Sequence, residues 1–142
     1  MFLDIVLISS SIAVILSDVR HRRISNVIIL VIGVTCILMS VKNNLLSLHF
    51  YQSISVLLFG LILFRFGILA AGDSKLLAVY SIVIDPSYFQ LSLILTGIIG
   101  GVLATVILIR KKISDNKPDD GVPYGIPIVI SGLMGIYLSK LS

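Results

Sequence analysis

Six apolar segments run through this chain of 142 residues, and they constrain its fold more than any other feature. They cover about residues 2–17, 25–41, 53–69, 71–84, 88–109 and 126–141. An α-helix needs about 17–25 residues to cross the hydrocarbon of a bilayer, and only the fourth segment is clearly short. Charged residues make up 13% of the chain, against roughly a quarter in soluble domains. We therefore predict an all-α membrane bundle with six transmembrane helices, forming one domain over residues 1–142.

The basic residues predict how this bundle is oriented. A basic cluster at residues 20–23 follows the first apolar segment instead of preceding it, which argues against a cleavable signal peptide and places the N-terminus outside. With six spans, nine of the eleven Lys and Arg residues fall on the cytoplasmic side, and only Lys42 and Lys140 fall outside. If the short fourth segment did not cross, the basic residues 110–112 would be translocated. Six spans are thus favoured, with a cytoplasmic loop at residues 110–125.

Composition also argues against several functional classes. The net charge of +4 does not indicate nucleic acid, because the basic residues are scattered at segment ends. The single cysteine, Cys36, excludes an intramolecular disulfide and a cysteine zinc site. His21 and His49 fall on opposite sides of the membrane, and neither belongs to a cluster with carboxylates. We expect no metal and no organic cofactor.

All seven acidic residues are Asp, and two of them lie at the edges of apolar segments. Asp18 follows the first segment and Asp73 opens the fourth, both on the cytoplasmic side. Because the fourth segment is short, Asp73 is expected about one turn inside the membrane boundary. An ionisable group at that depth costs roughly 3 kcal/mol or more and marks a functional site by default. The other five are expected in ordinary helix starts, turns or the polar linker: Asp4, Asp85, Asp115, Asp119 and Asp120.

Two carboxylates at one membrane face suit the acid–base hydrolysis of a peptide. Close together in a low-dielectric site they do not both ionise, so one keeps its proton near neutral pH. The ionised group takes a proton from water while the protonated one polarises the peptide carbonyl. One alternative pairs Asp18 with Arg20 or Arg22. A second makes Asp73 the N-cap of the fourth helix, and a third is an ion-coupled transporter or another non-catalytic membrane subunit.

Three short motifs resemble those of the type IV prepilin peptidases, a branch of the GxGD intramembrane aspartyl proteases. The GxGDxKL signature of that family is similar to residues 70–76, AAGDSKL. The segment with the family's other active-site Asp resembles residues 18–26, DVRHRRISN, and its Pro-Tyr-Gly segment resembles residues 122–127, VPYGIP. The three motifs occur in the family order.

The resemblance implies that Asp18 and Asp73 are the catalytic pair of an aspartic endopeptidase in the cytoplasmic (inner) membrane of a prokaryote. Its partners would be membrane lipids and, as substrate, the leader of a prepilin or pseudopilin, which is short and basic and ends in Gly before a hydrophobic helix. The chain resembles the short Tad/Flp-type or archaeal-type members, because it lacks the paired cysteines of the methyltransferase domain. Ala70 replaces the first Gly of GxGD, and we expect activity to survive with a changed fit of the substrate.

Five further residues are expected to support the site or bind substrate: Gly72, Lys75, Asn26, Tyr124 and Gly125. Lys75 would otherwise be a lysine that extends to the interface, and Asn26 would otherwise cap the second helix. Tyr124 and Gly125 would line the mouth of the cleft or anchor the chain at the interface.

Small residues also recur at helix-packing spacing. Gly97 and Gly101 form a GxxxG pair, and Ser131 and Gly135 repeat the pattern in the last segment. Such pairs let helix backbones approach closely. We interpret them as packing within the bundle, with a homodimer interface through Gly97 and Gly101 as the alternative.

Overall fold

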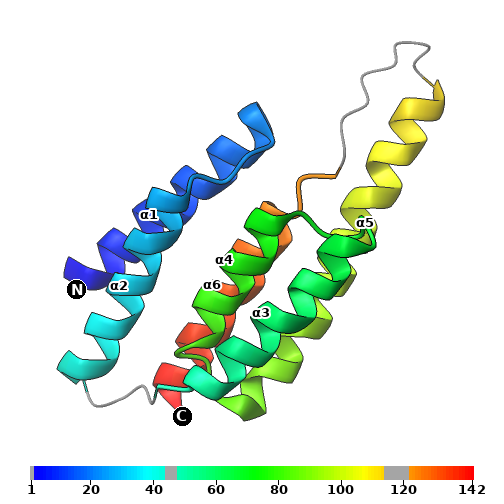
Figure 1. The fold of residues 1–142 in the computed structure, drawn as a ribbon. Coiled ribbons are helices and arrows are strands. Elements are labelled where there is room, and N and C mark those ends of the chain that lie inside the picture. The colour runs from blue at the N-terminus through cyan, green and yellow to red at the C-terminus, as the bar shows by residue number, and fades with distance from the viewer. Residues whose placement is uncertain (1, 44–47, 114–121) are drawn as a thin grey trace.

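The computed structural model describes residues 2–43, 48–113 and 122–142, and over these residues the chain is entirely helical, as predicted (Figure 1). The helices are α1 (Phe2–His21), α2 (Asn26–Asn43), α3 (Phe50–Arg65), α4 (Ala71–Ser81), α5 (Pro86–Ile113) and α6 (Gly125–Leu141). Three acidic residues of the predicted polar linker lie outside the described residues: Asp115, Asp119 and Asp120.

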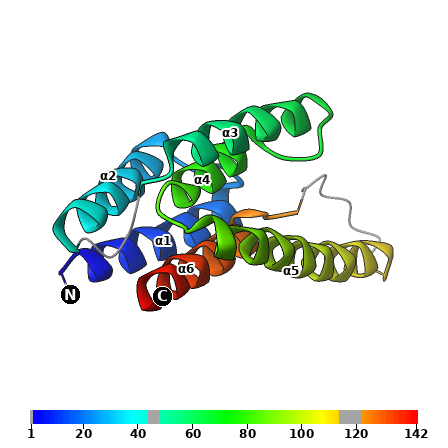
Figure 2. The same ribbon diagram turned by 90° about the horizontal axis from the view of Figure 1, so that it is seen from below.

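The helices are arranged in two layers of three (Figure 2). One layer contains α2, α4 and α3, and the other contains α1, α6 and α5, with α4 packed against α6 between the layers. The chain termini lie at the same end of the bundle (Figure 1). At that end the Lys140 ammonium pairs with the Asp4 carboxylate at 2.8 Å and ties α6 to α1. α4 and α6 are the middle helices of their layers, and each packs against both outer helices of its own layer.

Two helix ends differ from the sequence prediction because of backbone conformation. α1 continues to His21 instead of stopping near residue 17, so Asp18 lies inside the helix. It ends where Arg22 adopts a left-handed conformation, with φ of 53°, and the Arg22 N–H bonds the Asp18 carbonyl oxygen at 2.9 Å. α3 occupies Phe50–Arg65 instead of 53–69, and Gly67, with φ of 70°, follows its end.

α4 ends at Ser81, earlier than the predicted residue 84, and α3 side chains bond carbonyls of its last turn and of the segment that follows. The Gln52 amide nitrogen donates to the carbonyl oxygens of Ser81 and Ile84, at 3.0 and 3.1 Å. The Ser53 hydroxyl donates to the Ala78 carbonyl oxygen at 2.7 Å. Ser81 and Ile84 are buried, so these bonds replace those that water would otherwise supply.

The loop predicted at residues 110–125 is shorter than expected, since α5 runs from Pro86 to Ile113. Arg and Lys are good helix formers, so the basic residues that suggested a loop simply continue the helix. At the other end, Asp85 caps α5 by accepting the Ser87 N–H at 3.0 Å, with Pro86 at the first helical position. This confirms the turn expected at Asp85.

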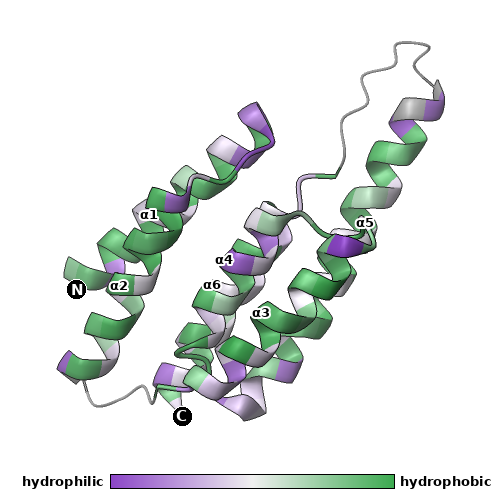
Figure 3. Ribbon diagram, viewed as in Figure 1, coloured by the Kyte–Doolittle hydropathy of each residue, from purple (hydrophilic) through white to green (hydrophobic). Residues whose placement is uncertain are grey.

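The helices are mostly apolar along their length (Figure 3), and much of this apolar character faces outward. Large hydrophobic side chains are exposed on several helices, among them Phe59, Ile98 and Leu108. Helices Phe2–His21 and Pro86–Arg110 are long and apolar enough to cross a membrane, while Asn26–Lys42, Phe50–Arg65 and Gly125–Leu141 are shorter apolar helices. An apolar surface of this extent suits contact with lipid better than contact with water.

The small residues pack differently from the prediction. A side chain at Gly97 or Gly101 would meet nothing within 4 Å, so these glycines do not pack inside the bundle. The α5 glycine that does is Gly100, where a β-carbon would lie 3.1 Å from the Tyr124 ring. The homodimer through Gly97 and Gly101 stays a prediction.

The last helix confirms its predicted packing role. The Ser131 hydroxyl and the Thr96 hydroxyl are 2.5 Å apart across the interface between α6 and α5. A β-carbon on Gly135 would collide with the Ser92 side chain.

Candidate active site

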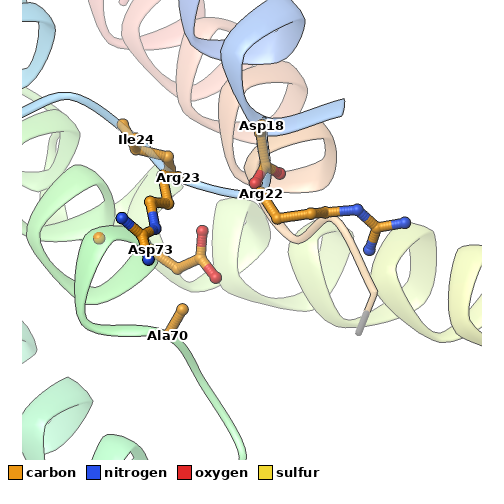
Figure 4. Close-up of a pocket in the computed structure, with 7 residues that line it drawn as sticks. Asp18, Arg22, Arg23, Ile24, Ala70 and Asp73 are labelled. Carbon is orange, nitrogen blue, oxygen red and sulfur yellow. The ribbon is translucent and has the colours of Figure 1, made fainter. Parts of the chain in front are cut away.

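A pocket of about 260 Å³ (Figure 4) lies at the end of α1 and the start of α4, the end of the bundle opposite the chain termini (Figure 1). Seven residues line it: Asp18, Arg22, Arg23, Ile24, Ala70, Gly72 and Asp73. Asp18 and Asp73, 55 positions apart in the sequence, thus share one pocket, and their carboxyl groups face the same space (Figure 4).

Asp18 is held by the start of α6. Its Oδ2 atom accepts the Gly125 N–H at 2.8 Å, and its side chain is only 6% exposed. Gly125 is the first residue of α6, where backbone N–H groups have no partner within the helix. Asp18 therefore caps a helix 107 positions away, and this bond takes the place of the predicted ion pair with Arg20 or Arg22. The Arg22 guanidinium points away from Asp18 (Figure 4).

The same contact explains why residue 125 is glycine. A β-carbon there would lie 2.7 Å from Asp18 Oδ2 and 3.0 Å from its Cγ, closer than real atoms approach. Any side chain at this position would therefore push the Asp18 carboxyl group out of its place.

Asp73 lies in the first turn of α4 and is 4% exposed. The N-cap position belongs to Ala70, so the alternative of Asp73 as N-cap is wrong. Instead Asp73 is the third residue of α4, the position from which an acidic side chain can reach back to the backbone N–H at the N-cap. Ala70 has φ of −76° and ψ of 151°, an ordinary extended conformation. The alanine in place of glycine therefore introduces no backbone strain, and its methyl group lines the pocket.

The start of α4 is fixed from two sides by close packing. The Ser74 hydroxyl donates to the Gly60 carbonyl oxygen at 3.0 Å, and a β-carbon on Gly60 would lie 2.7 Å from the Ser74 β-carbon. On the other side, a β-carbon on Gly72 would lie 3.3 Å from Ile24. Gly60 and Gly72 let α3 and the segment after α1 approach α4, and this holds Asp73 in position.

Two of the predicted supporting residues bond each other. The Lys75 ammonium donates to Asn26 Oδ1 at 3.2 Å, which ties α4 to the first residue of α2. Neither residue lines the pocket. The Lys75 ammonium thus bonds a side chain of α2, and the Asn26 side-chain oxygen accepts from α4 instead of capping its own helix. Tyr124 packs against Gly100 and is also outside the pocket lining.

Several site residues escaped the sequence analysis. Ile24 lines the pocket, and nothing in the sequence indicated this. Gly60 and Ser74 position α4, and their small size was the only sequence feature that indicated a close approach. The arginines at 22 and 23 were interpreted mainly through topology, with Arg22 also as an alternative partner of Asp18, and both line the pocket. Within residues 2–43, 48–113 and 122–142, no three His, Cys, Asp or Glu side chains form a group that could hold a metal ion.

Comparison with known proteins identifies the family of this chain. The chain belongs to the type IV leader peptidase family, whose model matches residues 5–105. The match includes Asp18 and Asp73 and ends before Gly125. No curated protein and no solved structure matched. Family membership and the two long apolar helices indicate a protease of the leader-peptidase type that is membrane-bound.

Proposed function

We propose that this protein is an aspartic endopeptidase that removes the N-terminal leader of type IV prepilin-like (Flp-type) proteins. Asp18 and Asp73 are its catalytic pair, and the pocket that they line is its active site. The proposal rests on one observation: two buried carboxyl groups from α1 and α4 face the same pocket at one end of an apolar bundle.

The mechanism follows from the chemistry of paired carboxyl groups. One of the pair is ionised and takes a proton from a water molecule in the pocket as the water attacks the scissile carbonyl carbon. The other is protonated and polarises the carbonyl oxygen, then donates its proton toward the leaving amine. The Gly125 N–H holds the Asp18 carboxyl group in place through both steps. No covalent intermediate forms, and the pair returns to its starting protonation after product release.

The position of the pocket supports a substrate that spans the boundary between water and lipid. A prepilin leader is short and basic and precedes a hydrophobic helix, so its cleavage point lies at such a boundary. In the proposed orientation the six helices cross the cytoplasmic membrane, the N-terminus is outside, and the pocket opens toward the cytoplasm. Arg22 and Arg23 at the pocket are exposed and suited to lipid headgroups.

The test is removal of the leader from a co-expressed Flp-type prepilin, followed by the mass of the pilin. Asp18→Asn and Asp73→Asn preserve the size of each side chain, and each is expected to reduce cleavage by at least about 10³-fold. The matched control is Asp85→Asn, because Asp85 caps α5 outside the pocket and Asn is an equally good cap. This variant is expected to cleave like the wild type.

Retained cleavage in Asp18→Asn or Asp73→Asn, with normal insertion, would disprove the assignment of the pair. If the wild type cleaved no prepilin while remaining stably inserted, the non-catalytic alternatives would be favoured.

A further inference from the structure

A buried hydrogen bond joins the two helices that carry the aspartates. The Tyr80 hydroxyl on α4 and the Ser11 hydroxyl on α1 are 2.6 Å apart, and both side chains have no exposed surface. The Ser11 hydroxyl also donates to the Leu7 carbonyl oxygen at 2.7 Å. Since a serine hydroxyl has one hydrogen, the Tyr80 O–H donates to Ser11. A tyrosine of α4 is thus fixed to the backbone of α1 through one serine.

The Ser11–Tyr80 bond lies at matching positions on the two helices that carry the aspartates. Ser11 lies seven residues before Asp18, and Tyr80 lies seven residues after Asp73. Seven residues are about two helical turns, or roughly 10 Å, and bring a side chain back to nearly the same face. α1 and α4 run in opposite directions (Figure 1). Ser11 is therefore level with Tyr80, just as Asp18 is level with Asp73, along the same side of the two helices. The Ser11–Tyr80 bond therefore lies about two turns deeper than the aspartates.

The last helix provides the space that this bond needs. A β-carbon on Gly132 would lie 2.8 Å from the Tyr80 ring, so the ring can lie against α6 only because residue 132 is glycine. α1 and α4 each pack on α2 and α6, and the Tyr80 side chain bridges the distance between them. Val14 and Leu76, both without exposed surface, belong to the same core between the bond and the pocket.

We propose that Tyr80 and Ser11 are positioning residues that set the register of α1 against α4 and thereby place Asp18 opposite Asp73. Neither residue lines the pocket, so they act through the helices. Their effect on cleavage rests on the proposed function, whereas their effect on the separation of positions 18 and 73 does not.

The test measures that separation directly. Asp18→Cys and Asp73→Cys are combined with Cys36→Ala, and the pair is cross-linked in membranes with bifunctional thiol reagents of graded length. Adding Tyr80→Phe keeps the ring and the Ser11–Leu7 bond but removes the bridge. Cross-linking by the shortest effective reagent is expected to slow by about fivefold or more, the equivalent of one hydrogen bond. Ser11→Ala should have a similar effect, and the double substitution should add little to either single one.

Two controls distinguish a shift of α1 against α4 from a general loosening of the bundle. Tyr137→Phe makes the same chemical change on a side chain of α6 that is 36% exposed, and it should leave cross-linking unchanged. A second cysteine pair, Asp4→Cys with Lys140→Cys, reports the α1–α6 contact at the other end. Tyr80→Phe should leave that pair unchanged if it alters only the register of α1 against α4.

Unchanged cross-linking of positions 18 and 73 in both Tyr80→Phe and Ser11→Ala would overturn the proposal, as would equal slowing of the 4–140 pair. Failure of the 18–73 pair to react with any reagent would also overturn it, because the two positions would not face each other. In the cleavage assay, Tyr80→Phe is expected to lower kcat on the order of tenfold with KM unchanged, since misplaced catalytic groups act on the chemical step. If no prepilin is cleaved but cross-linking slows as described, the proposed function fails and the positioning role stands.

Discussion

Gly125 and Asp18 come closer together than a side chain at position 125 would allow. The contact combines a backbone donor at a helix start with a carboxyl oxygen 2.8 Å away, and it buries both groups. Only proline lacks a backbone N–H, so any other substitution keeps this donor but can displace it. The size of residue 125 therefore controls the position of Asp18.

Substitution of Gly125 by Ala should inactivate the protein without preventing its insertion. The added β-carbon would stand 2.7 Å from Asp18 Oδ2, so the carboxyl group has to turn out of the pocket. We expect cleavage of the prepilin to fall by about 10²-fold. Gly97→Ala is the matched control, because a β-carbon there meets nothing within 4 Å. Wild-type cleavage in Gly125→Ala would show that the Gly125–Asp18 contact is dispensable.

For individual residues, the sequence predicted the two aspartates better than the groups that hold them in place. Asp18 and Asp73 stood out because a carboxylate near a membrane interior is costly, whatever surrounds it. The Gly125 N–H left no mark of its own in the sequence, since every residue except proline carries that group. Tyr80 and Ser11 were hidden in the same way, because Tyr and Ser occur in apolar helices for many reasons.

α4 is the element whose end depends most on its neighbours. It has only 11 residues, and the buried carbonyls of Ser81 and Ile84 are bonded by Gln52 from α3. A short helix can therefore end inside the bundle without leaving its backbone unpaired. The sequence predicted the existence of all six helices but not this end, because hydropathy continues through Ile84 while the hydrogen-bond pattern changes at Ser81.

Loss of the Gln52 amide should destabilise the bundle. Gln52→Leu removes two hydrogen bonds to buried carbonyl oxygens, each worth about 0.6 kcal/mol on average in a membrane protein and up to roughly 1.7. We expect the free energy of unfolding in detergent to fall by about 1–3 kcal/mol. Gln90→Leu on α5 is the control, since Gln90 is exposed. Equal stability of the two variants would argue against this role for Gln52.

For the whole molecule, an even number of helices brings both termini to one end and the pocket to the other (Figure 1). The charge distribution had already predicted that the two aspartates share a side. The charge distribution could not predict that both side chains reach the same pocket. Topology fixes the side of the membrane on which a helix ends, but not the direction in which a particular side chain points.

The orientation can be tested with single cysteines introduced on a Cys36→Ala background. Positions 20 and 75, near the pocket, should react with a membrane-impermeant thiol reagent only from the cytoplasm. Position 86, the first residue of α5, should react only from outside; all three native residues are exposed. Labelling of position 86 from the cytoplasm would rule out six spans with an outside N-terminus.

The hydrogen bond between Asp18 and Gly125 also determines when the site can form during synthesis of the chain. Asp18 and Asp73 both leave the ribosome before the donor that holds Asp18, because this donor belongs to the start of α6. A chain halted after α5 would contain both aspartates and the whole region that matches the family, yet its first carboxylate would lack its anchor. In the proposed peptidase, therefore, the aspartate pair is held as described only when α6 has packed against α1, and hydrolysis is expected only after that step.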